Sequence, residues 1–71
     1  MGEFMNAILT QREKEIFELL VKNYSTKEIA LELRISEKTV RNHISNVMQK
    51  LGTKGRASAV IELIKLKEIV I

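Results

Sequence analysis

The amino-acid sequence predicts an all-α domain built from four short helices. Proline is absent from its 71 residues, and β-branched residues seldom alternate with polar ones as they do in strands. Three segments instead begin at a serine or threonine, a preferred N-terminal cap, and continue with apolar residues at helical spacing. A chain of this length forms one small domain, which is marginally stable unless its helices pack well or it self-associates.

The first helix is predicted to begin after Thr10 and to end near Asn23. Thr10 and Glu13 have the spacing of a capping box, in which each side chain bonds the backbone amide of the other residue. Apolar residues then recur at helical spacing, at Ile16, Phe17, Leu19 and Leu20. Asn tolerates the left-handed conformation that ends many helices, so we expect Asn23 to adopt it.

The second helix repeats this pattern. Ser25 and Glu28 form another capping box, and the helix is expected to end near Leu33 or Arg34. Its predicted buried stripe consists of Ile29, Ala30 and Leu33.

The third helix, residues 37–51, follows after a turn of three or four residues. Ser36 is its predicted cap, and Gly52 lies where a left-handed glycine ends a helix. One apolar line runs along it, through Val40, Ile44, Val47 and Leu51. The opposite face is polar and free of acids, with Lys38, Arg41, Asn42, Ser45 and Gln49.

The fourth helix is predicted from Gly55 or Arg56 to Leu66 or Lys67. Its apolar residues spread over roughly 220° at about 100° per residue, whereas one small core needs an arc of only about 100° or slightly more. We therefore expect a second copy of the chain to cover the surplus, which consists of Ala57, Ile61 and Ile64. The alternative is that the core wraps this helix more fully.

The N-terminus is expected to stand outside the domain. Residues 1–8 are predicted to be disordered, and residues 9–71 to form the folded domain. The dipeptide Glu3-Phe4 is one that a common cloning site encodes, and Met5 is a second plausible start, so residues 1–4 are interpreted as a cloning remnant.

The composition argues against several classes of protein. Cysteine is absent and His43 is the sole histidine, so neither a disulfide nor a metal site is expected. Glu13 and Glu28 are interpreted as helix caps, and no nucleophile–base pair suggests an enzyme or a cofactor. No apolar run approaches the about 20 residues of a membrane span, and no secretory signal is evident, which favours the cytoplasm.

The positive charge is concentrated in one stretch. The net charge is +3, and residues 36–56 alone carry +4, with five basic residues against Glu37. A basic stretch in an otherwise balanced domain is typical of a protein that binds a polyanion, although a solvated charged face remains an alternative. Two helices joined by a tight turn, the second with a polar outer face, also describe a helix-turn-helix.

Several ordered blocks match one family at the right spacing. They are Leu9-Thr10 with Arg12-Glu13, Lys27-Glu28-Ile29-Ala30, Ile35-Ser36 with Thr39-Val40-Arg41 and His43, and Lys50-Leu51-Gly52 with Arg56. From Leu9 to about Val60 the chain resembles the LuxR-type helix-turn-helix family of bacterial transcription regulators. Residues 26–30, 35–45 and 48–51 are most similar to a short sporulation regulator of that family without a sensor domain.

The resemblance implies a four-helix domain that dimerises through its last helix and reads DNA with its third. By position, the implied base contacts are Arg41, Asn42 and Ser45, and the implied phosphate contacts are Lys27, Thr39 and Lys50. From their chemistry, Lys38 and Ser36 are added to the phosphate contacts. The family usually has Gly where this chain has Asn23, and often a longer basic residue where it has Ser45.

Several of these roles have alternatives. Arg41 has the donors to bind a guanine, but a phosphate contact would use them as well. Asn42 can pair with an adenine or donate to a phosphate. Ser45 and Lys38 are alternatively plain solvent-facing residues, and Thr39 alternatively packs at the start of the helix. Ser36 is foremost a cap. His43 lies at the margin of the buried face, where a structural role is favoured over DNA contact.

The sequence thus predicts a dimeric, sequence-specific regulator that binds double-stranded DNA. An activator would also need a surface for RNA polymerase. One alternative is the output domain of a two-component or ligand-gated regulator. Another, from a different class, is a helical protein-interaction module that binds an acidic partner with its basic face.

Overall fold

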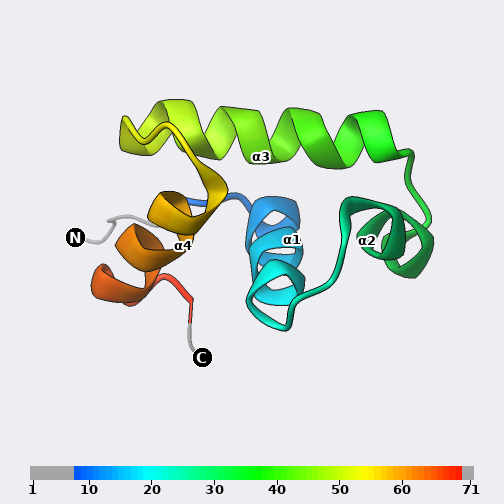
Figure 1. Ribbon diagram of the computed structural model, residues 1–71, viewed down its shortest axis with the longest axis horizontal. Helices are drawn as coiled ribbons and strands as arrows, with labels where there is room; N and C mark the ends of the chain where they lie inside the picture. Colours follow the sequence, from blue (N-terminus) through cyan, green and yellow to red (C-terminus); the bar gives the residue numbers. More distant parts are fainter. Residues whose placement is uncertain (1–7, 70–71) are drawn as a thin grey trace.

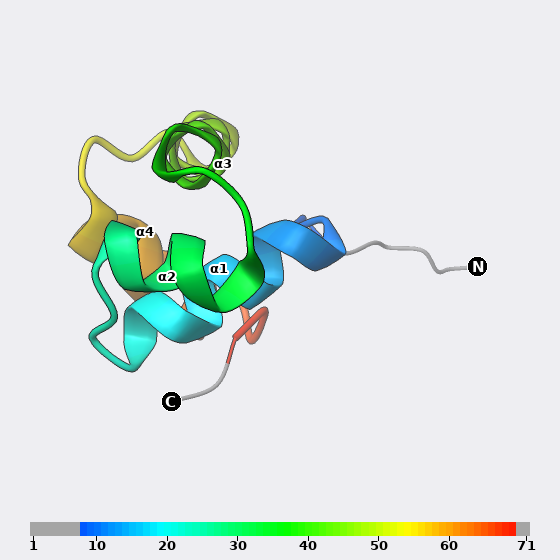
Figure 2. The same cartoon turned by 90° about the vertical axis from the view of Figure 1, so that its right-hand side faces the viewer.

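The computed structural model describes residues 8–69, and these residues form four helices. The helices are α1 (Gln11–Val21), α2 (Thr26–Leu33), α3 (Glu37–Leu51) and α4 (Arg56–Lys65). Figure 1 shows α3 lying across the other three, and the end-on view of Figure 2 shows it on one side of them. The predicted all-α architecture is confirmed for the described residues, while the predicted disorder of residues 1–8 falls outside them except at Ile8.

The starts of α1 and α2 are built as predicted. In α1 the amide of Thr10 donates to Glu13 Oε1 at 3.0 Å, and the amide of Glu13 donates to Thr10 Oγ1 at 3.1 Å. In α2 the amide of Ser25 donates to Glu28 Oε1 at 2.8 Å, and the amide of Glu28 donates to Ser25 Oγ at 3.1 Å. These bonds satisfy amides that a helix start otherwise leaves without partners.

Three of the four helix ends lie where the sequence predicts them, including the end of α2 at Leu33, and the fourth differs slightly. Asn23 and Gly52 adopt the expected left-handed conformation, with φ of 70° and 69°. Arg34 is also left-handed, with φ of 59°, which the sequence did not indicate. This turn brings the amide of Ile35 to the carbonyl of Ala30 at 3.0 Å and makes the connection to α3 tight. The last helix ends at Lys65, slightly earlier than predicted.

The core lies beneath α3, which packs against each of the other helices. Val40, Ile44 and Val47 of α3 are at most 2% exposed, so this helix supplies the middle of the core. The segment after α4 folds back and buries Ile69. The remaining core residues are Leu9, Ile16, Phe17, Ile29, Ala30, Ala59 and Leu63. Among residues 8–69, no helix combines the length and apolar character needed to cross a membrane.

Candidate nucleic-acid interface

The turn between α2 and α3 is short and limits how the two helices can be oriented relative to each other. Arg34, Ile35 and Ser36 connect them, and Ile35 packs against the core. Because α1, α2 and α4 all lie on one side of α3, no other described helix covers its opposite side (Figures 1 and 2). The predicted helix-turn-helix therefore exposes one long face of its second helix.

That outer face of α3 is a polar stripe, which we call the α3 stripe: Lys38, Asn42, Ser45 and Gln49. All four are exposed, and their spacing of four, three and four residues aligns them along the helix opposite Val40, Ile44 and Val47. Glu37, at the first position, is the sole acidic residue of α3. The α3 stripe itself thus carries no negative charge.

Arg41 lies at one edge of the α3 stripe. Its Nη1 is 3.3 Å from Glu37 Oε1, with side chains 56% and 44% exposed. An ion pair this exposed contributes little, because water and salt screen it. The guanidinium can therefore exchange Glu37 for another acceptor at low cost.

The start of α3 is organised by two hydroxyl groups. Ser36 Oγ accepts from the amide of Thr39 at 3.0 Å and shares a hydrogen bond with Thr39 Oγ1 at 2.9 Å. Ser36 is therefore the cap that the sequence predicted, while Thr39 is half-buried. Lys27, at the start of α2, is exposed. His43 is half-buried, consistent with its predicted place at the margin of the core.

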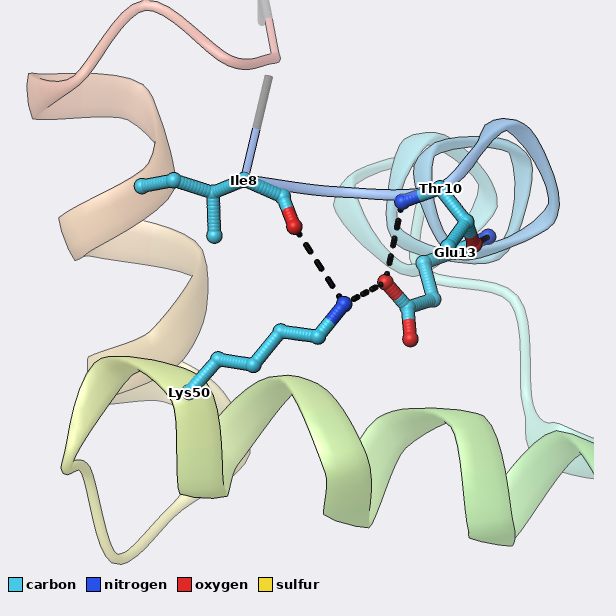
Figure 3. Close-up of polar contacts among 4 residues, drawn as sticks. All are labelled: Ile8, Thr10, Glu13 and Lys50. Carbon is cyan, nitrogen blue, oxygen red and sulfur yellow. Dashed lines mark hydrogen bonds and ion pairs between the residues drawn. The ribbon is translucent and has the colours of Figure 1, made fainter. Parts of the chain in front are cut away.

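Lys50 occupies a different environment from the other predicted contacts. Its Nζ lies 2.6 Å from Glu13 Oε1 and 3.2 Å from the carbonyl oxygen of Ile8 (Figure 3). Burial raises the pKa of Glu13, but hydrogen bonds from Lys50 and Thr10 outweigh it and hold that pKa below its usual 4.5.

Sequence reasoning identified Glu13 as a cap but missed this ion pair. One signal was available, because Glu13 precedes the buried residues Ile16 and Phe17 by one turn of the same helix face. A carboxylate at such a position needs a partner for its charge.

The predicted self-association residues line a groove between the end of α1 and α4. Ile61 is 55% exposed, Ala57 is exposed, and Ile64 is half-buried. Other residues of the groove are Leu20, Val21, Tyr24 and Val60. Exposed apolar surface of the kind predicted for the last helix is thus present at Ala57 and Ile61, whereas Ile64 packs against the core.

Known proteins share both the sequence and the fold of this chain. Residues 7–63 match the family model described as GerE, bacterial regulatory proteins of the luxR family. The spore germination protein GerE of Bacillus subtilis (strain 168) is 68% identical over 62 residues, covering 87% of this chain and 84% of GerE. The similarity to a short sporulation regulator expected from the sequence is therefore confirmed.

Longer regulators contain the same domain as one part. The transcriptional regulatory protein DegU of Brevibacillus brevis is 50% identical over 58 residues, and the match covers 82% of this chain but 25% of DegU. A solved structure of the transcription factor GerE superposes with a TM-score of 0.89 at 60% identity, covering 92% of this chain and 97% of that one. The crystal structure of the response regulator ChrA of a heme-sensing two-component system gives 0.83 at 33% identity, covering 94% of this chain and 33% of ChrA.

These matches extend over most of the chain and include the helix-turn-helix with its exposed α3 stripe. The chain therefore belongs to the LuxR family of bacterial regulatory proteins, which are DNA-binding transcription regulators rather than enzymes.

Proposed function

We propose that this protein binds a specific double-stranded DNA sequence as a dimer, with α3 of each copy in a major groove. The observation that carries the proposal is the exposed, acid-free α3 stripe, with the other three helices on the opposite side. A helix about 10–12 Å across fits a major groove about 12 Å wide. The tight turn at Arg34 supports the proposal, because a short connection between α2 and α3 restricts the angle at which α3 can enter the groove.

The residues near the α3 stripe divide into two roles. Arg41, Asn42 and Ser45 contact bases: the arginine has bidentate donors suited to a guanine, and the asparagine suits an adenine. Phosphates are contacted by Lys27, Ser36, Lys38 and Thr39, assisted by the amides at the starts of α2 and α3. The resemblance also implies a phosphate contact for Lys50, but its ammonium group lies 2.6 Å from Glu13 Oε1.

The groove between α1 and α4 is the surface for the second copy. Ala57, Ile61 and Ile64 of each chain would meet across a two-fold axis that passes near the α4 helices. The two α3 helices then face DNA half-sites about 10–10.5 bp apart, one turn of the duplex. We place the dimer on the nucleoid in the bacterial cytoplasm, with RNA polymerase as a further partner if the protein activates transcription.

The similarity to a spore germination protein supports target genes that act in sporulation. The similarity to the transcriptional regulatory protein DegU and to the response regulator ChrA supports a role in transcription regulation. The basic face also suits an acidic protein partner, but the family match favours DNA over that alternative.

Selection from a randomised DNA pool tests the proposal. The protein is mixed with random duplexes at near-physiological salt, and the bound DNA is recovered, amplified and sequenced over several rounds. We expect one enriched motif with two related half-sites about 10–10.5 bp apart. A single enriched half-site would contradict the dimer. Weak, salt-sensitive binding without enrichment would overturn sequence reading and favour the acidic protein partner.

A further inference from the structure

Lys50 connects two distant parts of the chain. It lies in the last turn of α3, while its Nζ contacts Glu13 of α1 and the carbonyl of Ile8 before that helix (Figure 3). Glu13 also accepts from the amide of Thr10, so one carboxylate joins the start of α1 to the end of α3. The Glu13 side chain is 5% exposed and that of Lys50 37%, so the carboxylate is the buried member of the pair.

The ion pair with Glu13, rather than position around the helix, sets Lys50 apart from the other predicted DNA contacts. At about 100° per residue, Lys50 lies about 180° from Arg41 around α3 but only about 20° from Thr39, a proposed phosphate contact. Turning the ammonium group toward a phosphate would leave Glu13 as a buried, unpaired charge. Losing the partner would be destabilising, because the Glu13 carboxylate is only 5% exposed and little water could replace the ammonium group.

We propose that Lys50 is a positioning residue for DNA binding rather than a phosphate ligand. Its bond to Glu13 holds the C-terminal end of α3 against the start of α1. This bond sets the angle at which the α3 stripe meets the base edges. The inference rests on the proposed sequence-specific function, and it assigns Glu13 and Lys50 one shared role.

Two substitutions separate this role from phosphate binding. Lys50→Met removes the ammonium group. Glu13→Gln removes the carboxylate charge, and Gln retains the oxygen that a capping box needs, so the start of α1 is preserved. Lys14→Met is the matched control, because Lys14 is an exposed lysine next to Glu13 on α1 and has no proposed role in DNA binding.

The experiment compares the wild-type chain, both single variants, the double variant and the control. Binding is titrated by fluorescence anisotropy against two labelled duplexes, the motif enriched from the random pool and a scrambled duplex of equal length, at several salt concentrations. Circular dichroism measures the folded fraction of each variant, and the affinities are calculated from the concentration of folded protein.

We expect each single variant to lower the preference for the selected duplex about tenfold, and the double variant to lower it no further. The slope of log affinity against log salt should stay at the wild-type value. The control should match the wild-type chain in its preference for the selected duplex.

Three results would overturn the proposal. If Lys50 binds phosphate, Lys50→Met reduces the slope of log affinity against log salt by about 0.9 per contact, while Glu13→Gln leaves the affinity for both duplexes unchanged. If the pair acts only on stability, both variants have lower melting temperatures, but their folded molecules prefer the selected duplex over the scrambled one as strongly as the wild-type chain does. If the wild-type chain binds both duplexes equally, the proposed function fails and the positioning role fails with it, whereas the first two results leave that function intact.

Discussion

Replacing Ile61 with Glu should break the proposed contact between two copies of the chain. Ile61 is 55% exposed on α4, in the groove that α4 forms with the end of α1. The substitution introduces a charge on an already exposed position, so the fold of the single chain should tolerate it. An interface formed there would lose an apolar contact and enclose a carboxylate instead.

The expected loss follows from the exposed fraction of Ile61. Full burial of an isoleucine side chain stabilises by about 1.5–3 kcal/mol, so burying the 55% that remains exposed contributes about 0.8–1.7 kcal/mol per copy. A two-fold interface contains the residue twice, which gives about 1.7–3.3 kcal/mol, or about a 15- to 230-fold weaker dimer. The desolvation of two carboxylates would add to this loss.

Analytical ultracentrifugation measures the dimer dissociation constant of the wild-type chain and of Ile61→Glu. Leu31→Glu is the matched control, because Leu31 is 72% exposed on α2, away from the groove. The control should dimerise like the wild-type chain. An equal dissociation constant for Ile61→Glu and the wild-type chain would refute the assignment of this groove to the second copy.

Three further predictions concern α3 and the start of α1. Arg41→Ala should weaken specific binding by about 1–3 kcal/mol and relax one base position, and an equal loss on random DNA would contradict base reading. Arg12→Ala, which removes an arginine from a comparable exposed ion pair on α1, is its control. Gly52→Ala should lower the free energy of unfolding by about 1–2 kcal/mol, because φ of 69° strains an L-residue although no atom lies within 4 Å of the added Cβ; an unchanged urea midpoint would contradict this. Because folding lowers the pKa of Glu13, its stabilising contribution is present above the ordinary pKa of 4.5 and is lost as pH falls through the lowered value. Urea unfolding should be measured between about pH 7 and about pH 3, which spans the titration of Glu13. The free energy of unfolding should fall more steeply with acid for the wild-type chain than for Glu13→Gln, and parallel curves of free energy against pH would contradict this.

Most of the fold could be predicted because its signals are local. The capping boxes of Thr10 and Ser25 and the left-handed residues Asn23 and Gly52 each depend on a few neighbouring residues. Arg34 gave no such signal, because arginine has no special preference for the left-handed conformation. Its conformation is set by the turn, which bonds the amide of the next residue to α2.

Features that depend on distant parts of the chain escaped prediction. Ile69 is 2% exposed, but it follows the end of α4, where helical periodicity no longer indicates which side is buried. Glu13 and Lys50 are 37 residues apart, so only the folded chain reveals their ion pair. The exposure of Arg41 and Asn42, by contrast, followed from the apolar line on the opposite side of the same helix.

The division of α3 into a buried and an exposed face has an evolutionary consequence. Val40, Ile44 and Val47 hold the domain together, whereas Asn42 and Ser45 make no contribution to that core. Surface substitutions of this kind usually change stability by no more than about 0.5 kcal/mol. If Asn42 and Ser45 read bases as proposed, a substitution at either position can therefore change the preferred operator while the stability of the fold stays nearly the same.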